Sequence, residues 1–182
     1  MKSRFIRSNT SSGLLTYQEL CSAASKDASV LENLIQGYKE QVDELLDREP
    51  FSGNTILHFA AQYYPDSLEL LIDVFGEKLL EVQNADGHTA AHYAARYNLE
   101  SLALLINRFG EKVFATKNDF GNTALHFAAK HNINSLALFI KKFGDKVLDV
   151  KNDDGETILH ITAMRSEAAL ALLMDEFGES AK

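Results

Sequence analysis

The sequence is poor in cysteine, in basic charge and in long apolar runs. Its 182 residues include one cysteine, Cys21, so no disulfide can form within the chain. The 26 acidic residues outnumber the 18 basic ones, and a net charge of −8 repels a phosphate backbone. No apolar stretch is long enough to cross a membrane. We therefore expect a soluble, cytoplasmic protein without a nucleic-acid partner and without membrane insertion.

The N-terminal residues carry the one clear bias toward positive charge. Lys2, Arg4 and Arg7 precede the first acidic residue, Glu19, as in some mitochondrial transit peptides. The segment is short, however, and it lacks both a long amphipathic pattern and the apolar region of a secretory signal. We expect residues 1–15 to form a flexible basic arm ahead of a folded domain at residues 16–182.

A seven-residue pattern recurs along the rest of the chain. It reads TILHFAA at 55–61, TAAHYAA at 89–95 and TALHFAA at 123–129. The threonines are about 34 residues apart, and each has a glycine two places before it and a histidine three places after it. Such a period is typical of stacked repeats, which bury their apolar surface against their neighbours. The sequence therefore predicts an elongated array without one central core.

Each repeat carries signals for two helices. In the first, paired alanines such as Ala60 and Ala61 allow close approach between helices. In the second, Leu68, Leu71, Ile72 and Phe75 follow the i, i+3, i+4, i+7 spacing of one buried helical face, and the same spacing recurs in the later repeats.

Two kinds of residue predict where the second helix of each repeat starts and stops. Asn98 and Asn132 stand between the two helices, where we expect a turn with positive φ. Glycines follow the second helices and predict helix ends in the left-handed conformation. These glycines are Gly76, Gly110, Gly144 and Gly178.

Together, T-x-L-H-x-A-A, the helix pair, the glycine stop and a turn ending in D-G resemble the signature of ankyrin repeats. The resemblance implies an all-α solenoid of stacked helix-turn-helix units joined by hairpin-like turns. It divides the chain into 53–86, 87–120, 121–154 and 155–182, after a degenerate capping unit at 16–52 that opens with a Thr16–Glu19 capping box.

The repeats depart from the usual family pattern in two respects. Ankyrin repeats of ~33 residues carry a proline after the threonine, whereas this chain has Ile56, Ala90, Ala124 and Ile158 there. The extra residue of each repeat falls between the glycine stop and the next turn. We expect this segment to be more curled than the open hairpin of the family.

The repeated histidines do not form a metal site. His58, His92, His126 and His160 recur at the repeat step, roughly 10 Å apart, which is too far for one ion. In ankyrin proteins this histidine bonds to backbone groups and ties the turn to the helix, and we expect the same structural role here.

No other motif points to catalysis. The acidic stretch 152–156 resembles a calcium loop, but Val150 and Ile161 occupy positions that must be acidic. Cys21 takes the histidine-equivalent place in the capping unit, where we expect a buried, inert thiol. Nucleotide, hydrolase and zinc-protease motifs are missing. We therefore predict no enzyme, no catalytic residue, no metal, no cofactor and no small-molecule substrate.

The resemblance implies that turn tips and short helices form a concave face that binds another protein. Aromatic and arginine side chains, which often dominate interface energies, recur there on adjacent repeats. The acidic tips and basic helices further predict a partner with basic residues at one edge and acidic residues at the other. The candidate partner-binding residues are Phe51, Asn54, Gln62, Tyr63, Asp86, His88, Arg96, Tyr97, Asp119, Phe120, Asn122, Lys130, His131, Asp153, Asp154, Met164 and Arg165.

The last repeat is as apolar as the interior ones, with Leu170, Leu173, Met174 and Phe177 in its second helix. Terminal repeats normally have a polar outer face, so we expect the natural chain to continue beyond Lys182. Two interpretations remain open. One is a scaffold that captures a protein partner. The other is the targeting or regulatory domain of a larger enzyme, or of a secreted bacterial effector in the host cytoplasm, whose catalytic part lies after residue 182.

Overall fold

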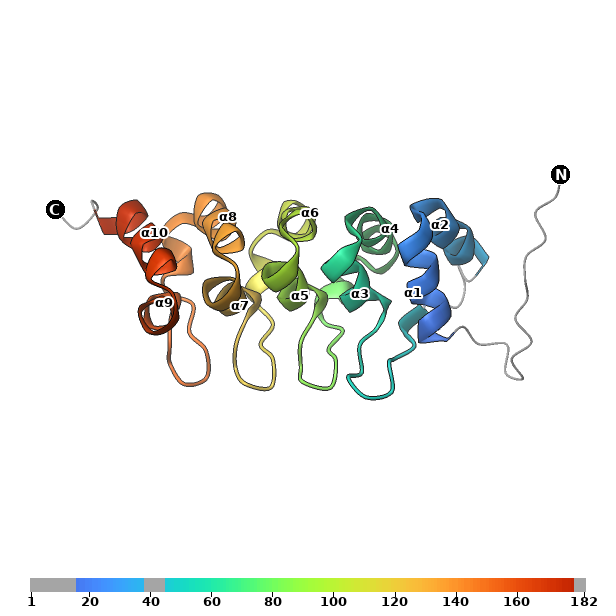
Figure 1. Cartoon of the computed structure of the whole chain (residues 1–182), viewed down its shortest axis with the longest axis horizontal. Coiled ribbons are helices and arrows are strands. Elements are labelled where there is room, and N and C mark those ends of the chain that lie inside the picture. Colours follow the sequence, from blue (N-terminus) through green and yellow to red (C-terminus); the bar gives the residue numbers. More distant parts are fainter. Residues whose placement is uncertain (1–15, 38–44, 179–182) are drawn as a thin grey trace.

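The computed structural model describes residues 16–37 and 45–178 and shows a row of helix pairs (Figure 1). No strand occurs in these two ranges, and the predicted all-α repeat solenoid is confirmed. The expected basic arm at 1–15 lies outside the described residues. The helices are α1 (Tyr17–Lys26), α2 (Ala28–Gly37), α3 (Ile56–Tyr63), α4 (Pro65–Phe75), α5 (Ala90–Tyr97), α6 (Leu99–Phe109), α7 (Ala124–His131), α8 (Ile133–Phe143), α9 (Ile158–Arg165) and α10 (Glu167–Phe177).

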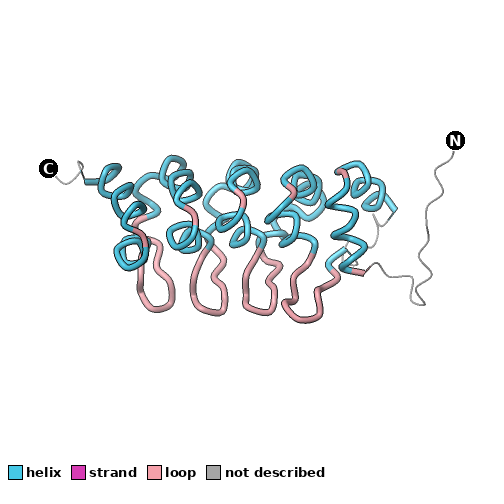
Figure 2. Tube along the Cα trace, in the orientation of Figure 1, coloured by secondary structure: helices cyan, strands magenta, loops and turns pink. Residues whose placement is uncertain are grey.

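The helices form two rows. The inner helices α1, α3, α5, α7 and α9 pack each against the next, and the outer helices α2, α4, α6, α8 and α10 do the same. Long turns project from the side of the inner helices (Figure 2). The paired alanines of α3, α5 and α7 are almost fully buried, as predicted, because only small side chains fit between closely packed inner helices. The turns and the inner helices thus share one side of the array.

A capping box starts the inner helix of each repeat. In α3 the Leu57 amide donates to Thr55 Oγ1 (3.3 Å), and the Thr55 amide donates to His58 Nδ1 (3.1 Å). The bond from the threonine amide to the histidine ring recurs in α5, α7 and α9. In α1 the predicted box is present with Thr16 and Glu19. These side chains satisfy amides that a helix start leaves without partners.

The outer helices start differently from the prediction. The positive φ expected at Asn98 and Asn132 is wrong, since their φ angles are −142° and −148°. Both residues are N-caps that accept from the amides of Ser101 (3.1 Å) and Ser135 (3.2 Å), and extended backbone suits that role. In the first repeat Pro65 occupies the first helical position, where its fixed φ suits a helix start without a side-chain cap.

Three of the four outer helices stop at their predicted glycine, but the left-handed conformation predicted for these glycines is wrong. Gly76, Gly110 and Gly144 have φ of 52°, 58° and 54°, but their ψ values of −137°, −134° and −137° differ from those of a left-handed helix. The expectation is wrong at Gly178, whose φ of −69° and ψ of −24° continue the right-handed helix. Positive φ at Gly76, Gly110 and Gly144 lets the chain turn sharply into the 3₁₀ helix that follows each of them.

The extra residue of each repeat is absorbed by these 3₁₀ helices. They are η2 (Gly76–Leu80), η3 (Gly110–Phe114) and η4 (Gly144–Val147). Leu79, Val113 and Val147 are buried in them at 0–2% exposure. The segment is therefore curled, as the repeat length predicts, and it packs into the core.

Neighbouring turns contact each other through their backbones. The Ala85 amide donates to Ser52 O (2.9 Å), and the Asp119 amide donates to Asp86 O (3.2 Å). At Gly121, where φ is +72°, an added Cβ would lie 2.6 Å from the Asp153 amide nitrogen. Only glycine combines this conformation with so close an approach, which keeps the turns in contact.

We predict that Gly121→Ala lowers the free energy of unfolding more than Gly155→Ala does. Both sites have positive φ, which costs an alanine about 1–2 kcal/mol, but a Cβ at Gly155 meets nothing within 4 Å. The clash with the next turn should cost Gly121→Ala a further ~1–3 kcal/mol in urea unfolding. Equal losses would show that the turns do not pack as closely as described.

Candidate functional site

The predicted partner-binding residues fall on one side of the array, which we call the inner face. It consists of the last turns of the inner helices and the tips of the turns. The most exposed apolar residues of this face are Phe51 (93%), Met164 (70%), Phe120 (64%), Tyr63 (54%) and Tyr97 (47%). The helix row comprises Gln62, Tyr63, Arg96, Tyr97, Lys130, His131, Met164 and Arg165, and the tip row comprises Phe51, Asp86, Asp119, Phe120, Asp153 and Asp154.

Each aromatic side chain of the helix row packs on another ring one helical turn earlier. The supporting rings are half-buried and belong to the core's edge. The pairs and their centroid distances are Phe59–Tyr63 (5.3 Å), Tyr93–Tyr97 (6.0 Å) and Phe127–His131 (5.8 Å). Because a supported side chain loses less rotamer freedom on binding, this part of the inner face is pre-organised.

The repeated histidines join each repeat to the next. Nε2 of His58 contacts His88 O (2.8 Å), Nε2 of His92 contacts Asn122 O (2.9 Å), and Nε2 of His126 contacts Glu156 O (3.2 Å). The predicted structural role is confirmed for these three. It holds only in part for His160, which is exposed and bonds only to Thr157 among the described residues.

The buried histidine rings are neutral at pH 7. Burial lowers the pKa of His58 and of His92 to about 4, although the backbone carbonyl that each one contacts acts in the opposite direction. In the neutral ring Nδ1 accepts from the threonine amide while Nε2–H donates across the repeat boundary. In the described ranges no three His, Cys, Asp or Glu side chains gather as a metal site would require.

A set of buried asparagines that the sequence analysis missed shapes the turns. Oδ1 of Asn84 accepts from the amides of Asp86 (3.0 Å) and His88 (2.9 Å), and Asn118 and Asn152 hold equivalent places. Nδ2 of Asn84 donates to Asn54 Oδ1 (2.9 Å). The sequence holds a signal for them, because these asparagines stand three places before Gly87, Gly121 and Gly155.

A hydrogen bond between two asparagine side chains, which we call the asparagine link, gives two predicted site residues a structural role. Asn54 accepts from Asn84, and Asn122 Oδ1 accepts from Nδ2 of Asn152 (3.2 Å). These side-chain oxygens therefore already bind within the chain, so Asn54 and Asn122 contribute to the support of the inner face. Their half-buried positions agree with that role.

His88 interrupts the asparagine link. It stands where the neighbouring repeats have Asn54 and Asn122, and Nδ2 of Asn118 is buried without a hydrogen-bond partner. The His88 ring instead packs edge-on against Phe127 at 4.9 Å. Burial lowers its pKa, and the nearby Asp86, Arg96 and Asp119 also act on the ring. His88 thus lies between the acidic tips and the basic helix row.

The charges of the inner face are only partly paired. Lys117 Nζ lies 2.7 Å from Asp153 Oδ1, which weakens the predicted acidic edge. The Arg96 guanidinium lies 4.8 Å from the Tyr97 ring centroid. Partial burial, followed by the nearby cations Arg96, Lys130 and Arg165, holds the pKa of His131 below its ordinary value. The helix row therefore keeps a net positive charge.

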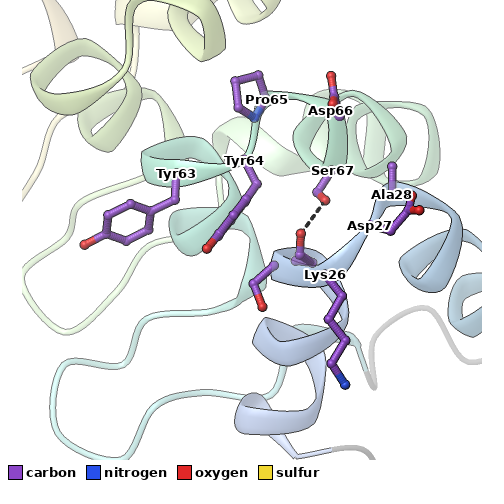
Figure 3. A pocket seen from close by; sticks show the side chains of 10 residues that line it. Lys26, Asp27, Ala28, Tyr63, Tyr64, Pro65, Asp66 and Ser67 are labelled. Atoms are coloured by element: carbon purple, nitrogen blue, oxygen red, sulfur yellow. Dashed lines mark hydrogen bonds between the residues drawn. The ribbon is translucent and has the colours of Figure 1, made fainter.

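One open cavity lies where the capping unit meets the first repeat (Figure 3). Its volume is about 300 Å³, and its lining includes Lys26, Asp27, Tyr64 and Ser67. The Ser67 hydroxyl donates to Ala24 O (2.9 Å) and thereby joins the two units beside it. The sequence analysis did not predict this cavity, because it arises at a junction between two irregular helix ends.

The Cys21 thiol is buried, as expected for the histidine-equivalent position of the capping unit. Burial raises the pKa of this thiol to about 11, although a hydrogen bond from Tyr17 lowers it in part. A thiol with this pKa is almost fully protonated at pH 7 and is a weak nucleophile. Cys21 therefore packs as a small apolar residue.

Comparison with known proteins identifies the repeat type. A family model described as ankyrin repeats (3 copies) matches residues 20–115 and 102–181. A search of curated proteins finds no match. None of the helices in the described ranges has both the length and the apolar character needed to span a membrane. The two matched ranges together run from residue 20 to residue 181, which is more than half of the chain.

We expect the unfolding free energy to fall as the pH drops from 7 to 5. Unfolded His58 and His92 titrate near 6.5, whereas the folded rings resist protonation down to about 4. Their stabilising contribution is therefore complete above pH 6.5 and is lost at lower pH, by about 2 kcal/mol per histidine at pH 5. Urea unfolding at several pH values measures this loss.

The control for that measurement is the double variant His58→Gln/His92→Gln. Glutamine keeps an acceptor at the third helical position but does not titrate. The variant should show a much smaller decline between pH 7 and 5. An equal decline in both proteins would rule out the buried rings as its cause.

We further predict that His88→Asn stabilises the fold by ~0.5–1 kcal/mol. The new side-chain oxygen would accept from Nδ2 of Asn118, which now has no partner. His131→Asn, at an exposed site, serves as the control and should leave the urea midpoint unchanged. A His88→Asn protein no more stable than the original would contradict the interpretation of Asn118 as unsatisfied.

Proposed function

Since this chain belongs to the ankyrin-repeat family, whose members are generally protein-interaction modules, we propose that it captures a partner protein on its inner face. The proposal requires no cofactor and no chemical step, and ankyrin-repeat folds are typically non-catalytic. It places the protein in the cytoplasm, a reducing compartment in which the buried thiol of Cys21 stays free.

The observation that carries this proposal is the row of exposed aromatic residues, whose rings pack on half-buried rings of the same helices. Tyr63 and Tyr97 are about half exposed, and each packs on a ring of its own helix. Phe120 belongs to the neighbouring tip row, and 64% of its surface is exposed. Large, pre-organised aromatic side chains supply much contact area at a small entropic cost, which suits a binding surface.

The support beneath these residues favours the same function. Arg48 donates to Gln83 O (2.7 Å) in the next turn, and Gln83 Nε2 donates to Lys117 O (2.9 Å) in the turn after that. Such links hold successive turns in a fixed order. A partner that contacts several turns at once would then bind without first having to order them.

The test is affinity capture from a cytosolic lysate with the variant Tyr63→Ala/Tyr97→Ala/Phe120→Ala/His131→Ala. Truncating central aromatic anchors costs roughly 2 kcal/mol or more, so partner recovery should drop at least about 30-fold. The matched control truncates four exposed outer-helix residues at the repeat step, Asp73→Ala/Asn107→Ala/Lys141→Ala/Asp175→Ala.

Circular dichroism first establishes that all three proteins are equally helical. Capture that survives in the control but not in the aromatic variant supports the inner face as the binding site. If the aromatic variant retains the same proteins as the original, or the control loses them, the inner face is not the site.

A further inference from the structure

Cations on the two sides of the array differ in their pairing. On the outer helices and the 3₁₀ segments, Arg108 pairs with Asp73 (2.7 Å), and Lys112 pairs with Glu77 (2.6 Å). Lys146 pairs with Glu111 in the same manner. Each of these bonds joins one repeat to the preceding one. These three outer cations are therefore matched within the chain.

The cations of the helix row are not matched. Arg96, Lys130 and Arg165 stand in the last turns of α5, α7 and α9, and none of them has an acidic partner among the described residues. They lie close enough together for all three to act on His131. Charges of one sign that gather on adjacent helices create a positive potential along the surface.

The repeat spacing fixes how a ligand could meet these cations. Adjacent packed helices are roughly 10 Å apart. A chain in the polyproline II conformation advances ~3.1 Å per residue with three residues per turn, so its residues i, i+3 and i+6 share one face. Arg96 and Lys130 stand at equivalent positions of adjacent repeats, and Arg165 stands one residue after the equivalent Met164. One cation per repeat corresponds to about three residues of such a ligand. A segment with acidic residues at positions i, i+3 and i+6 would present a carboxylate to each of the three cations.

We propose that the inner face binds an extended acidic segment of the partner, with carboxylates about three residues apart on Arg96, Lys130 and Arg165. The inference rests on the proposed function, because it assigns a charge pattern to the same face. Tyr97 and Phe120, beside this row, offer apolar contacts for side chains between the acids. Charge complementarity selects this occupant over a basic or neutral segment.

Helix stability offers a simpler reason for the same cations. Positive side chains favour the C-terminal ends of helices, where the macrodipole is negative. If the cations served only this role, removing them would lower the stability of the fold and would not change which ligands bind. The helix-end role and the binding role are thus separable by experiment.

The experiment uses a displayed library of random 12-residue peptides and the full chain as bait. The charge variant is Arg96→Gln/Lys130→Gln/Arg165→Gln, and Arg96→Lys/Arg165→Lys retains the charge. The matched control removes three paired outer cations, Arg108→Gln/Lys112→Gln/Lys146→Gln, so its net charge changes equally. Thermal unfolding of each variant measures any effect on stability separately.

The expected result is enrichment of peptides with Asp or Glu three residues apart by the original chain, the charge-retaining variant and the outer control. The charge variant should bind the best such peptide about 10-fold more weakly, because three exposed ion pairs are each worth a few-fold in Kd. Raising the salt concentration should weaken binding by the original chain and hardly affect the charge variant.

Two results would overturn the inference. Enriched peptides without that acidic spacing, or equal enrichment by the charge variant, would refute the acidic segment while leaving protein binding on the inner face intact. If the original chain enriches no peptides, or if the Tyr63, Tyr97, Phe120 and His131 alanine variant enriches the same ones, both the inference and the proposed function fail.

Discussion

The structure depends on the hydrogen bonds of the histidine that stands three places after each repeat's threonine, whose ring is buried in the first three of the four full repeats. Nδ1 of His92 completes the capping box of its own helix, while Nε2 reaches the backbone of the following turn at 2.9 Å. One neutral side chain therefore satisfies a helix start and joins two repeats. Each bond contributes only about 1 kcal/mol, but the same arrangement at His58 and His126 holds the turns in register with the helices. These bonds therefore fix the positions of the turns and inner helices that form the inner face.

Much of this fold could be predicted from the sequence because the array repeats a local pattern. The capping boxes, the buried alanines and the 3₁₀ segments all follow from residues close together in the chain. The errors came where a residue type has two local uses. Asn98 was expected in a turn with positive φ, but it caps a helix. Its side-chain oxygen accepts from the Ser101 amide, which would otherwise lack an acceptor at the helix start. Gly178 has the residue type of a helix stop, but its φ of −69° is that of a right-handed helix.

The site was less predictable, because side-chain pairing between repeats is not visible in one repeat's pattern. The sequence placed Asn54, Asn122 and Asp153 among the candidate binding residues. In the structure two of them accept hydrogen bonds from asparagines of the following turn, and Asp153 pairs with Lys117. Arg96, by contrast, remains without an acidic partner among the described residues and stacks on Tyr97. The sequence predicts a binding surface, and the contacts separate its supporting residues from those that a ligand could reach.

The central claim is that the turns are ordered before any partner arrives. Native-state hydrogen exchange of the free protein tests it most directly, through the amides of Ala85 and Asp119, which donate to the preceding turn. The account predicts that both amides exchange at rates close to those of the α5 and α7 amides, because the turns open only when the helices do. Exchange of these two amides at the rate of an unstructured peptide, with the helices still protected, would contradict it.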